Sequence, residues 1–121
     1  MLAVALVAGC AALIRPPAPG MTASADLNDR AGRSVGAATF TQVGEVVRIL
    51  LEVRDLPPGT KAVHVHAIGR CDPPDFTTAG GHFNPHGRQH GVLNPEGPHA
   101  GDLPNMTVEA DGRGRLETAS D

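Results

Sequence analysis

The order of apolar and polar residues along the chain predicts a domain built from short β-strands. Candidate strands at 22–27, 34–42, 45–53 and 61–67 are separated by turn-forming residues at 29–32, 43–44 and 57–59. Within the third segment every second residue from Val47 to Val53 is apolar and most residues between them are polar, so one face should pack on a core. Two more strands are expected at 106–110 and 115–119, joined by a turn at 111–114. We therefore expect an antiparallel all-β domain whose first four strands form a meander of hairpins.

The region from about 69 to 105 breaks this pattern, because glycine, proline, asparagine and histidine dominate it. A connection of this length is uncommon in a small domain and is usually either functional or disordered. Ordering it costs conformational entropy, so we expect a metal, a disulfide or both to organise it.

Histidines gather in and around this loop. Five of the six lie between His64 and His90. A lone surface histidine is more often solvated than a ligand, but a cluster of imidazoles suits copper and zinc. Strand alternation places His64 and His66 on one face of the fourth strand, which suits a planar copper-type centre. His90, His99 and Asp102 come from the loop and suit a tetrahedral zinc site.

The totals favour one small, turn-rich domain. The chain has 121 residues, of which 40% are hydrophobic, with 15 glycines and 11 prolines. The net charge of −3 and the lack of a basic run or aromatic stacking pattern argue against a nucleic-acid partner.

The first fourteen residues are apolar and uncharged, which suits a secretory signal and is too short to span a bilayer. The segment from Val7 to Cys10 resembles a bacterial lipobox, although no basic residue precedes the apolar run. Conventional signal cleavage at the Ala-x-Ala site of residues 23–25 would instead release a soluble protein, but it would cut into the first expected strand. A third interpretation is that the N-terminal apolar segment is buried. Residues 15–20 form a proline-rich spacer, and the folded domain should occupy 21–121. We expect export to the periplasm or cell envelope, with membrane anchoring through lipidated Cys10 favoured over soluble secretion.

Five segments, HVHAIGRC, TAGGHFNP, RQHG, PHAGDLPN and ADGRG, resemble the copper/zinc superoxide dismutases of the bacterial secreted or lipoprotein type, in the same order and at near-family spacing. The resemblance runs from about Thr22 to the end of the chain. It implies an antiparallel Greek-key β-sandwich or barrel of immunoglobulin-like architecture with a long metal-binding loop, a fold already established for the family. It also implies an enzyme that converts superoxide to oxygen and hydrogen peroxide by copper redox cycling, with a structural zinc and possible homodimer formation.

Carried over position by position, the resemblance assigns His64 and His66 to copper and makes His82 the bridge between copper and zinc. These three would be the catalytic residues, with the bridge exchanging copper for a proton. The zinc ligands would be His82, His90, His99 and Asp102. His86 matches no ligand position and should be a solvated loop residue.

The family pattern continues past the ADGRG turn with two strands that carry a fourth copper-binding histidine, a second cysteine and an arginine beside copper. Arg113 and Arg115 do not match that arginine, and Cys71 resembles a loop cysteine whose disulfide partner is absent, so we expect a free thiol. We therefore expect a domain whose C-terminal strands are missing. The alternative functions are a truncated, non-catalytic zinc- and copper-binding domain, or a β-domain without metal. Arg70 and Arg88 are candidates for attracting superoxide, although solvated loop residues are the simpler interpretation.

Overall fold

The computed structural model describes residues 20–120, which form six β-strands and one short 3-10 helix, η1 (Thr77–Ala79). The strands lie where apolar alternation predicts them, with ends that differ by a few residues. They are β1 (Thr22–Asn28), β2 (Ser34–Val43), β3 (Val46–Val53), β4 (Gly59–His64), β5 (Asp102–Val108) and β6 (Gly114–Ser120). The all-β prediction is therefore confirmed.

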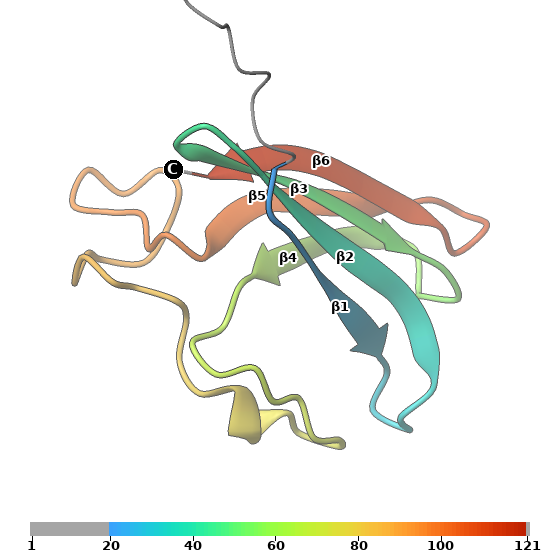
Figure 1. The fold of residues 1–121 in the computed structure, drawn as a ribbon. Coiled ribbons are helices and arrows are strands. Elements are labelled where there is room, and N and C mark those ends of the chain that lie inside the picture. Colours follow the sequence, from blue (N-terminus) through green and yellow to red (C-terminus); the bar gives the residue numbers. More distant parts are fainter. Residues whose placement is uncertain (1–19, 121) are drawn as a thin grey trace, which may run out of the picture.

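The strands form one antiparallel sheet in the order β1-β2-β3-β6-β5-β4 (Figure 1). The first three strands are the expected meander, but the prediction that β4 continues it is wrong. β3 pairs with β6, and β4 pairs with β5 at the other edge. The connection contains Pro57 and Pro58, which have no N–H to donate to a tight hairpin. Leu56 instead donates its N–H to Gly112, which ties this connection to the β5–β6 turn.

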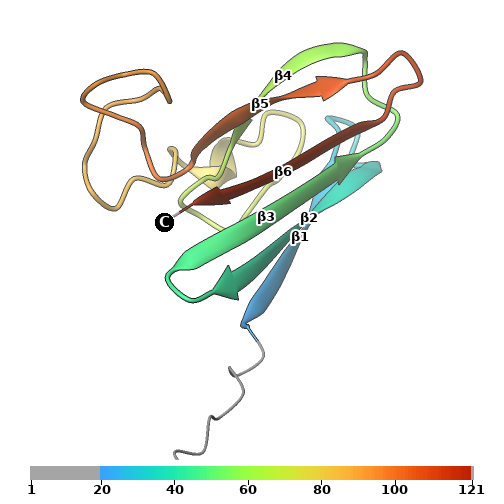
Figure 2. The ribbon, with the colours of Figure 1, turned by 90° about the horizontal axis from the view of Figure 1, so that it is seen from above.

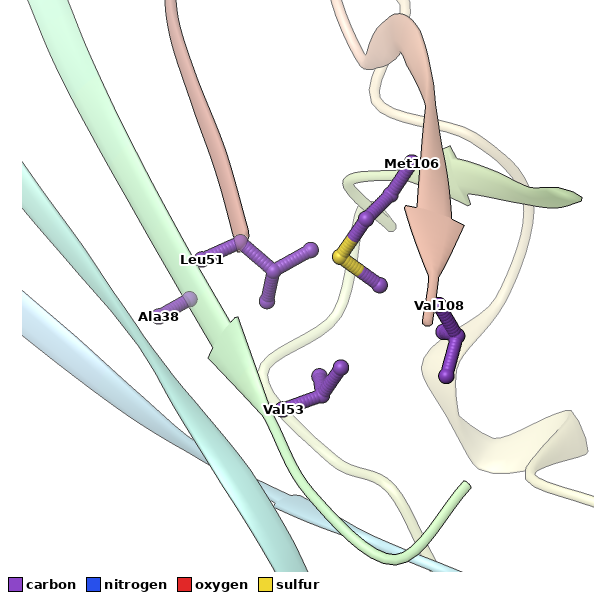
Figure 3. Packing of buried hydrophobic residues seen from close by; sticks show 5 residues of the cluster. All are labelled: Ala38, Leu51, Val53, Met106 and Val108. Carbon is purple, nitrogen blue, oxygen red and sulfur yellow. The ribbon is translucent and has the colours of Figure 1, made fainter. Parts of the chain in front are cut away.

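The sheet folds into two layers because β5 and β6 are paired at a single position, Val108 with Gly114. Beyond that point the β4–β5 ribbon separates from β1-β2-β3-β6 (Figure 2). The core fills the space between the layers (Figure 3), and its buried members are Ala38, Leu51, Val53, Met106 and Val108. The apolar face predicted for the third strand is confirmed, since Ile49, Leu51 and Val53 are buried while Glu52 is exposed. Among the described residues β1 and β4 remain the two open edges.

The long loop starts and ends earlier than predicted. β4 ends at His64, so His66 lies beyond the strand, and β5 begins at Asp102, directly opposite His64 in the register. The sequence pattern predicts this strand only from residue 106 because Pro104 is a poor strand residue. The pairing shifts between Lys61 and Val63, and this irregularity accommodates Pro104 inside the ladder.

The N-terminal predictions lie outside the described residues. These include the signal segment, Cys10 and most of the spacer. From residue 20 to residue 120 the structure contains no helix with the length and apolar character needed to cross a membrane.

Candidate metal centre

Asp102 is the centre of a compact group of side chains. It is the first residue of β5, and its side chain is 2% exposed. Its Oδ1 atom lies 3.0 Å from Nδ1 of His82, 3.0 Å from Nδ1 of His90 and 3.6 Å from Nδ1 of His99. The Nδ1 atoms of His82 and His99 are themselves 3.3 Å apart. These four side chains, the zinc ligands implied by the family resemblance, form what we call the zinc group.

The distances between ligand atoms in the zinc group can be compared with those of a tetrahedral zinc site. Zinc binds nitrogen and oxygen ligands at about 2.0–2.1 Å, so two ligand atoms of a tetrahedral site are about 3.3 Å apart. The separations of 3.0, 3.0, 3.3 and 3.6 Å within the group are close to that value. Three imidazole nitrogens and one carboxylate oxygen are also ligands that zinc accepts. The residues present therefore fit a four-coordinate zinc ion.

Hydrogen bonds keep Asp102 in the charged form that a metal requires. Its second oxygen, Oδ2, accepts the backbone N–H of Gly91 at 2.8 Å and that of His99 at 3.1 Å. Burial alone would raise the pKa of Asp102, but these two bonds and the side-chain bond with His90 outweigh it and hold that pKa well below its usual range. The carboxylate is thus ionised and oriented, with Oδ1 toward the histidines.

His64 and His66, which we call the copper pair, flank Val65 and lie beside His82. Nδ1 of His66 is 2.8 Å from the carbonyl oxygen of Gly80, which can only accept, so Nδ1 carries the proton and Nε2 is free for a metal. The ring of His66 meets that of His82 edge-on, with centroids 5.2 Å apart. The ring of His64 stacks on His82 at 4.1 Å.

The environment of His64 also favours metal binding. Burial lowers the pKa of His64, and the neighbouring His82 lowers it further, so the neutral imidazole is favoured. A neutral imidazole is the form that binds a metal ion.

The two predicted sites do not converge equally. Ligand atoms of His64, His82, His90 and Asp102 all lie within 4.8 Å of one another, whereas one member of each predicted site, His66 and His99, is outside this set. His64, expected to serve copper, therefore also borders the zinc group. The structure brings all six predicted ligands into one region, with the zinc group the more tightly assembled part.

The remaining candidates lie at the periphery. His86 is exposed and lines an open cavity of 410 Å³ with Arg88, and the thiol of Cys71 is free and exposed within the described part of the chain. Arg70 is paired with Asp72 at 2.5 Å. Sequence reasoning did not foresee the supporting backbone contacts at Gly80, Gly91 and His99. The glycines beside ligands in TAGGHFNP, RQHG and PHAGDLPN were the available signal.

The family assignment follows from a comparison with known sequences. Residues 34–121 match the family model for copper/zinc superoxide dismutase (SODC). This chain belongs to the copper/zinc superoxide dismutase family. The family uses copper and zinc, and the histidine and aspartate side chains of the site could hold a metal ion.

Relatives of this chain come from several bacteria. It is 48% identical over 94 residues to superoxide dismutase [Cu-Zn] 1 of Aquifex aeolicus, a match that covers 77% of this chain and 56% of that relative. It is 40% identical over 132 residues to superoxide dismutase [Cu-Zn] of Deinococcus radiodurans, covering 96% of this chain and 68% of that protein. The chain spans about half the length of most of the curated relatives it matches.

Solved structures support the same fold. A SOD-like protein from Bacillus subtilis matches with a TM-score of 0.73 and 39% identity, covering 78% of this chain and 64% of that one. The Cu/Zn superoxide dismutase from Brucella abortus matches with a TM-score of 0.68 and 26% identity, covering 83% of this chain and 72% of the other. The predicted sandwich architecture is therefore confirmed.

Proposed function

We propose that the protein containing this chain dismutates superoxide to oxygen and hydrogen peroxide. The observation that carries the proposal is the position of His82. Its Nδ1 atom faces Asp102 and His99 in the zinc group, while its ring contacts both members of the copper pair. A histidine placed in this way can serve two metal ions with its two nitrogens.

Each residue has a definite task in this proposal. His64, His66 and His82 would hold copper, which supplies the one-electron chemistry when bound. The carbonyl oxygen of Gly80 engages Nδ1 of His66, which leaves Nε2 of that ring free to bind copper. With Nδ1 engaged in the zinc group, His82 has Nε2 available either as a copper ligand or to carry a proton toward the peroxide product. Zinc has no redox chemistry, and it would hold His82 and the loop in place.

The test is superoxide consumption by the full chain after loading with copper and zinc. Turnover that scales with bound copper and is lost in His66→Ala, with zinc retained, would support dismutation. Zinc-only protein is the control. Full occupancy of both metals without turnover would contradict it.

The second candidate is a non-catalytic domain that binds zinc firmly and copper loosely. It is favoured by the close assembly of the zinc group, in which three imidazole nitrogens lie 3.0–3.6 Å from Oδ1 of Asp102. Zinc retained through dialysis, copper lost in the same experiment and no turnover at any copper concentration would identify this function.

We also propose that the protein is exported to the periplasm or cell envelope and anchored by a lipid on Cys10. The apolar, uncharged segment before Cys10 and its lipobox-like sequence support this. Incorporation of a labelled fatty acid that disappears in Cys10→Ser is the expected result, and equal labelling of both proteins would contradict it. Homodimer formation is a further proposal, tested by sedimentation at several protein concentrations.

A further inference from the structure

Three loop and strand-end residues form a closed ring of backbone hydrogen bonds. Val65 donates its N–H to Gly101, Gly101 donates to Phe83, and Phe83 donates to Val65, each at 2.8 Å. We call this arrangement the Gly101 ring. It lies just beyond the end of the β4–β5 ladder, where His64 pairs with Asp102. The ring therefore adds a third segment, around Phe83, to a two-stranded ladder.

Every member of the ring is next in sequence to a metal-ligand candidate. Val65 lies between the two residues of the copper pair, Phe83 follows His82, and Gly101 precedes Asp102. Because these candidates are sequence neighbours of residues held by the ring, the ring limits how far the copper pair, His82 and Asp102 can move relative to one another.

Position 101 has room for glycine only. A Cβ atom built on Gly101 would lie 2.3 Å from the carbonyl oxygen of Val65 and 3.1 Å from the backbone nitrogen of Phe83. These two atoms are the acceptor and the donor of one of the three hydrogen bonds of the ring, from Phe83 to Val65, so any larger residue must push these segments away from Gly101. The requirement is one of space, because the backbone angle of Gly101 is not in the left-handed region.

Gly81 provides a matched comparison. It also directly precedes a zinc-group residue, His82, and its carbonyl also accepts a loop hydrogen bond, from Ala67 at 2.9 Å. A Cβ atom on Gly81 would meet nothing within 4 Å. The two glycines thus share a sequence context and differ in the space around them.

We infer that the Gly101 ring is a positioning device that couples the copper pair to the zinc group, and that it depends on glycine at 101. The inference rests on the metal binding proposed above. Widening the ring moves Asp102 away from its position relative to His82, and it moves the copper pair relative to both residues. A single added methyl group at position 101 therefore disturbs both sites, although it removes no ligand.

The experiment compares Gly101→Ala with Gly81→Ala in the full chain, using cobalt(II) as a coloured substitute for zinc, then zinc and copper(II). Changes around metal ligands typically cost 10–100-fold in affinity, so Gly101→Ala should weaken cobalt and zinc binding by about that factor. Its visible cobalt bands should shift, and copper binding should weaken with them. Gly81→Ala should stay within about twofold of the unmodified chain, as expected for a substitution that meets no neighbour. Equal affinities and spectra for the two variants would overturn the inference.

Amide hydrogen exchange on the unmodified chain gives a second reading if Gly101→Ala fails to fold by circular dichroism. The three ring amides should be protected together and exchange more slowly once zinc is added. Exchange of any one of them at the rate of an unbonded loop amide would overturn the ring. None of these measurements uses superoxide, so an inactive protein with an intact ring would contradict the proposed enzyme alone.

Discussion

Replacing Asp102 with asparagine separates the structural role of this residue from its role as a metal ligand. Oδ2 accepts two backbone N–H groups, and Oδ1 faces three imidazole nitrogens. An asparagine side chain can place its carbonyl oxygen on the two N–H groups, which leaves its NH₂ group toward the histidines. That group donates hydrogen bonds and cannot bind a cation. Asp102→Asn should therefore keep the local fold and remove one ligand.

The expected loss of zinc affinity is large. Structural zinc sites of four ligands bind with about 10–16 kcal/mol, so an equal share per ligand is about 2.5–4 kcal/mol. At 1.4 kcal/mol for each factor of ten, this corresponds to a weakening of roughly 10²–10³-fold. Asp102 is the one anionic member of a group whose atoms lie 3.0–3.6 Å apart, which places it toward the upper end. The metal-free fold should lose only about 1–2 kcal/mol, because the two backbone bonds change from charge-assisted to neutral.

Zinc affinity is measured by competition with a coloured chelator, and the metal-free stability by urea unfolding in the presence of a chelator. Asp111→Asn is the matched control. Asp111 is exposed in the β5–β6 turn and also accepts a backbone N–H, from Arg113 at 3.0 Å, but lies outside the zinc group. Zinc affinity of Asp102→Asn within about threefold of Asp111→Asn, less than 1 kcal/mol apart, would refute the assignment of Asp102 as a ligand.

Three other changes test the core, the first turn and the separation of the metals. Val108 is 2% exposed, so Val108→Ala should lower the free energy of unfolding by about 2 kcal/mol. Val43 is 54% exposed, so Val43→Ala should change the free energy of unfolding by less than about 0.5 kcal/mol. Equal losses for the two variants in urea unfolding would contradict the assignment of Val108 to the core. Hydrogen bonds from the backbone and then the side chain of Arg33 lower the pKa of Asp29, so its stabilisation is present above about pH 4 and is lost as the pH falls through the folded pKa. Asp29→Asn should accordingly flatten the acid side of the stability curve, and an unchanged slope would count against these bonds. His66→Ala should weaken copper(II) binding and leave zinc binding unchanged, whereas His99→Ala should weaken zinc binding and leave copper(II) binding unchanged. Metal analysis after dialysis measures both. Loss of both metals in each variant would contradict the assignment of two separate ligand sets.

The strands could be predicted from the sequence because alternation is a local property. Val47 to Val53 place an apolar residue at every second position, and the structure buries that face. The partner of β4 could not be predicted in the same way. Whether the chain turns back after Pro57 and Pro58 or crosses to the far edge depends on β6, which occupies the position beside β3 and is more than fifty residues away in sequence. Pairing of this kind is decided by the whole sheet and not by the turn.

Candidate metal ligands could be named from the sequence because few side chains bind zinc or copper, and five of the six histidines fall in one segment. The positions of these candidate ligands on the fold were harder to predict. Asp102 was expected in the loop but begins β5, since Pro104 conceals a strand whose pairing is irregular there. His66 was expected on a strand but lies beyond β4, where it forms an isolated antiparallel bridge with His82.

The length of the loop proved a weaker argument for a metal than the geometry of its side chains. The sequence suggested that a metal or a disulfide must order it, yet the loop has its own backbone hydrogen bonds. These include the Gly101 ring, the bond from Ala67 to Gly81 and the bond from Gln89 to Glu96. Such bonds offset part of the entropy cost that motivated the prediction. They do not account for three imidazoles placed around one buried carboxylate oxygen at 3.0–3.6 Å, an arrangement that a fold without a metal ion has no need to build. The case for the metal centre therefore depends on Asp102 and its neighbours, and it would stand even if the loop were short.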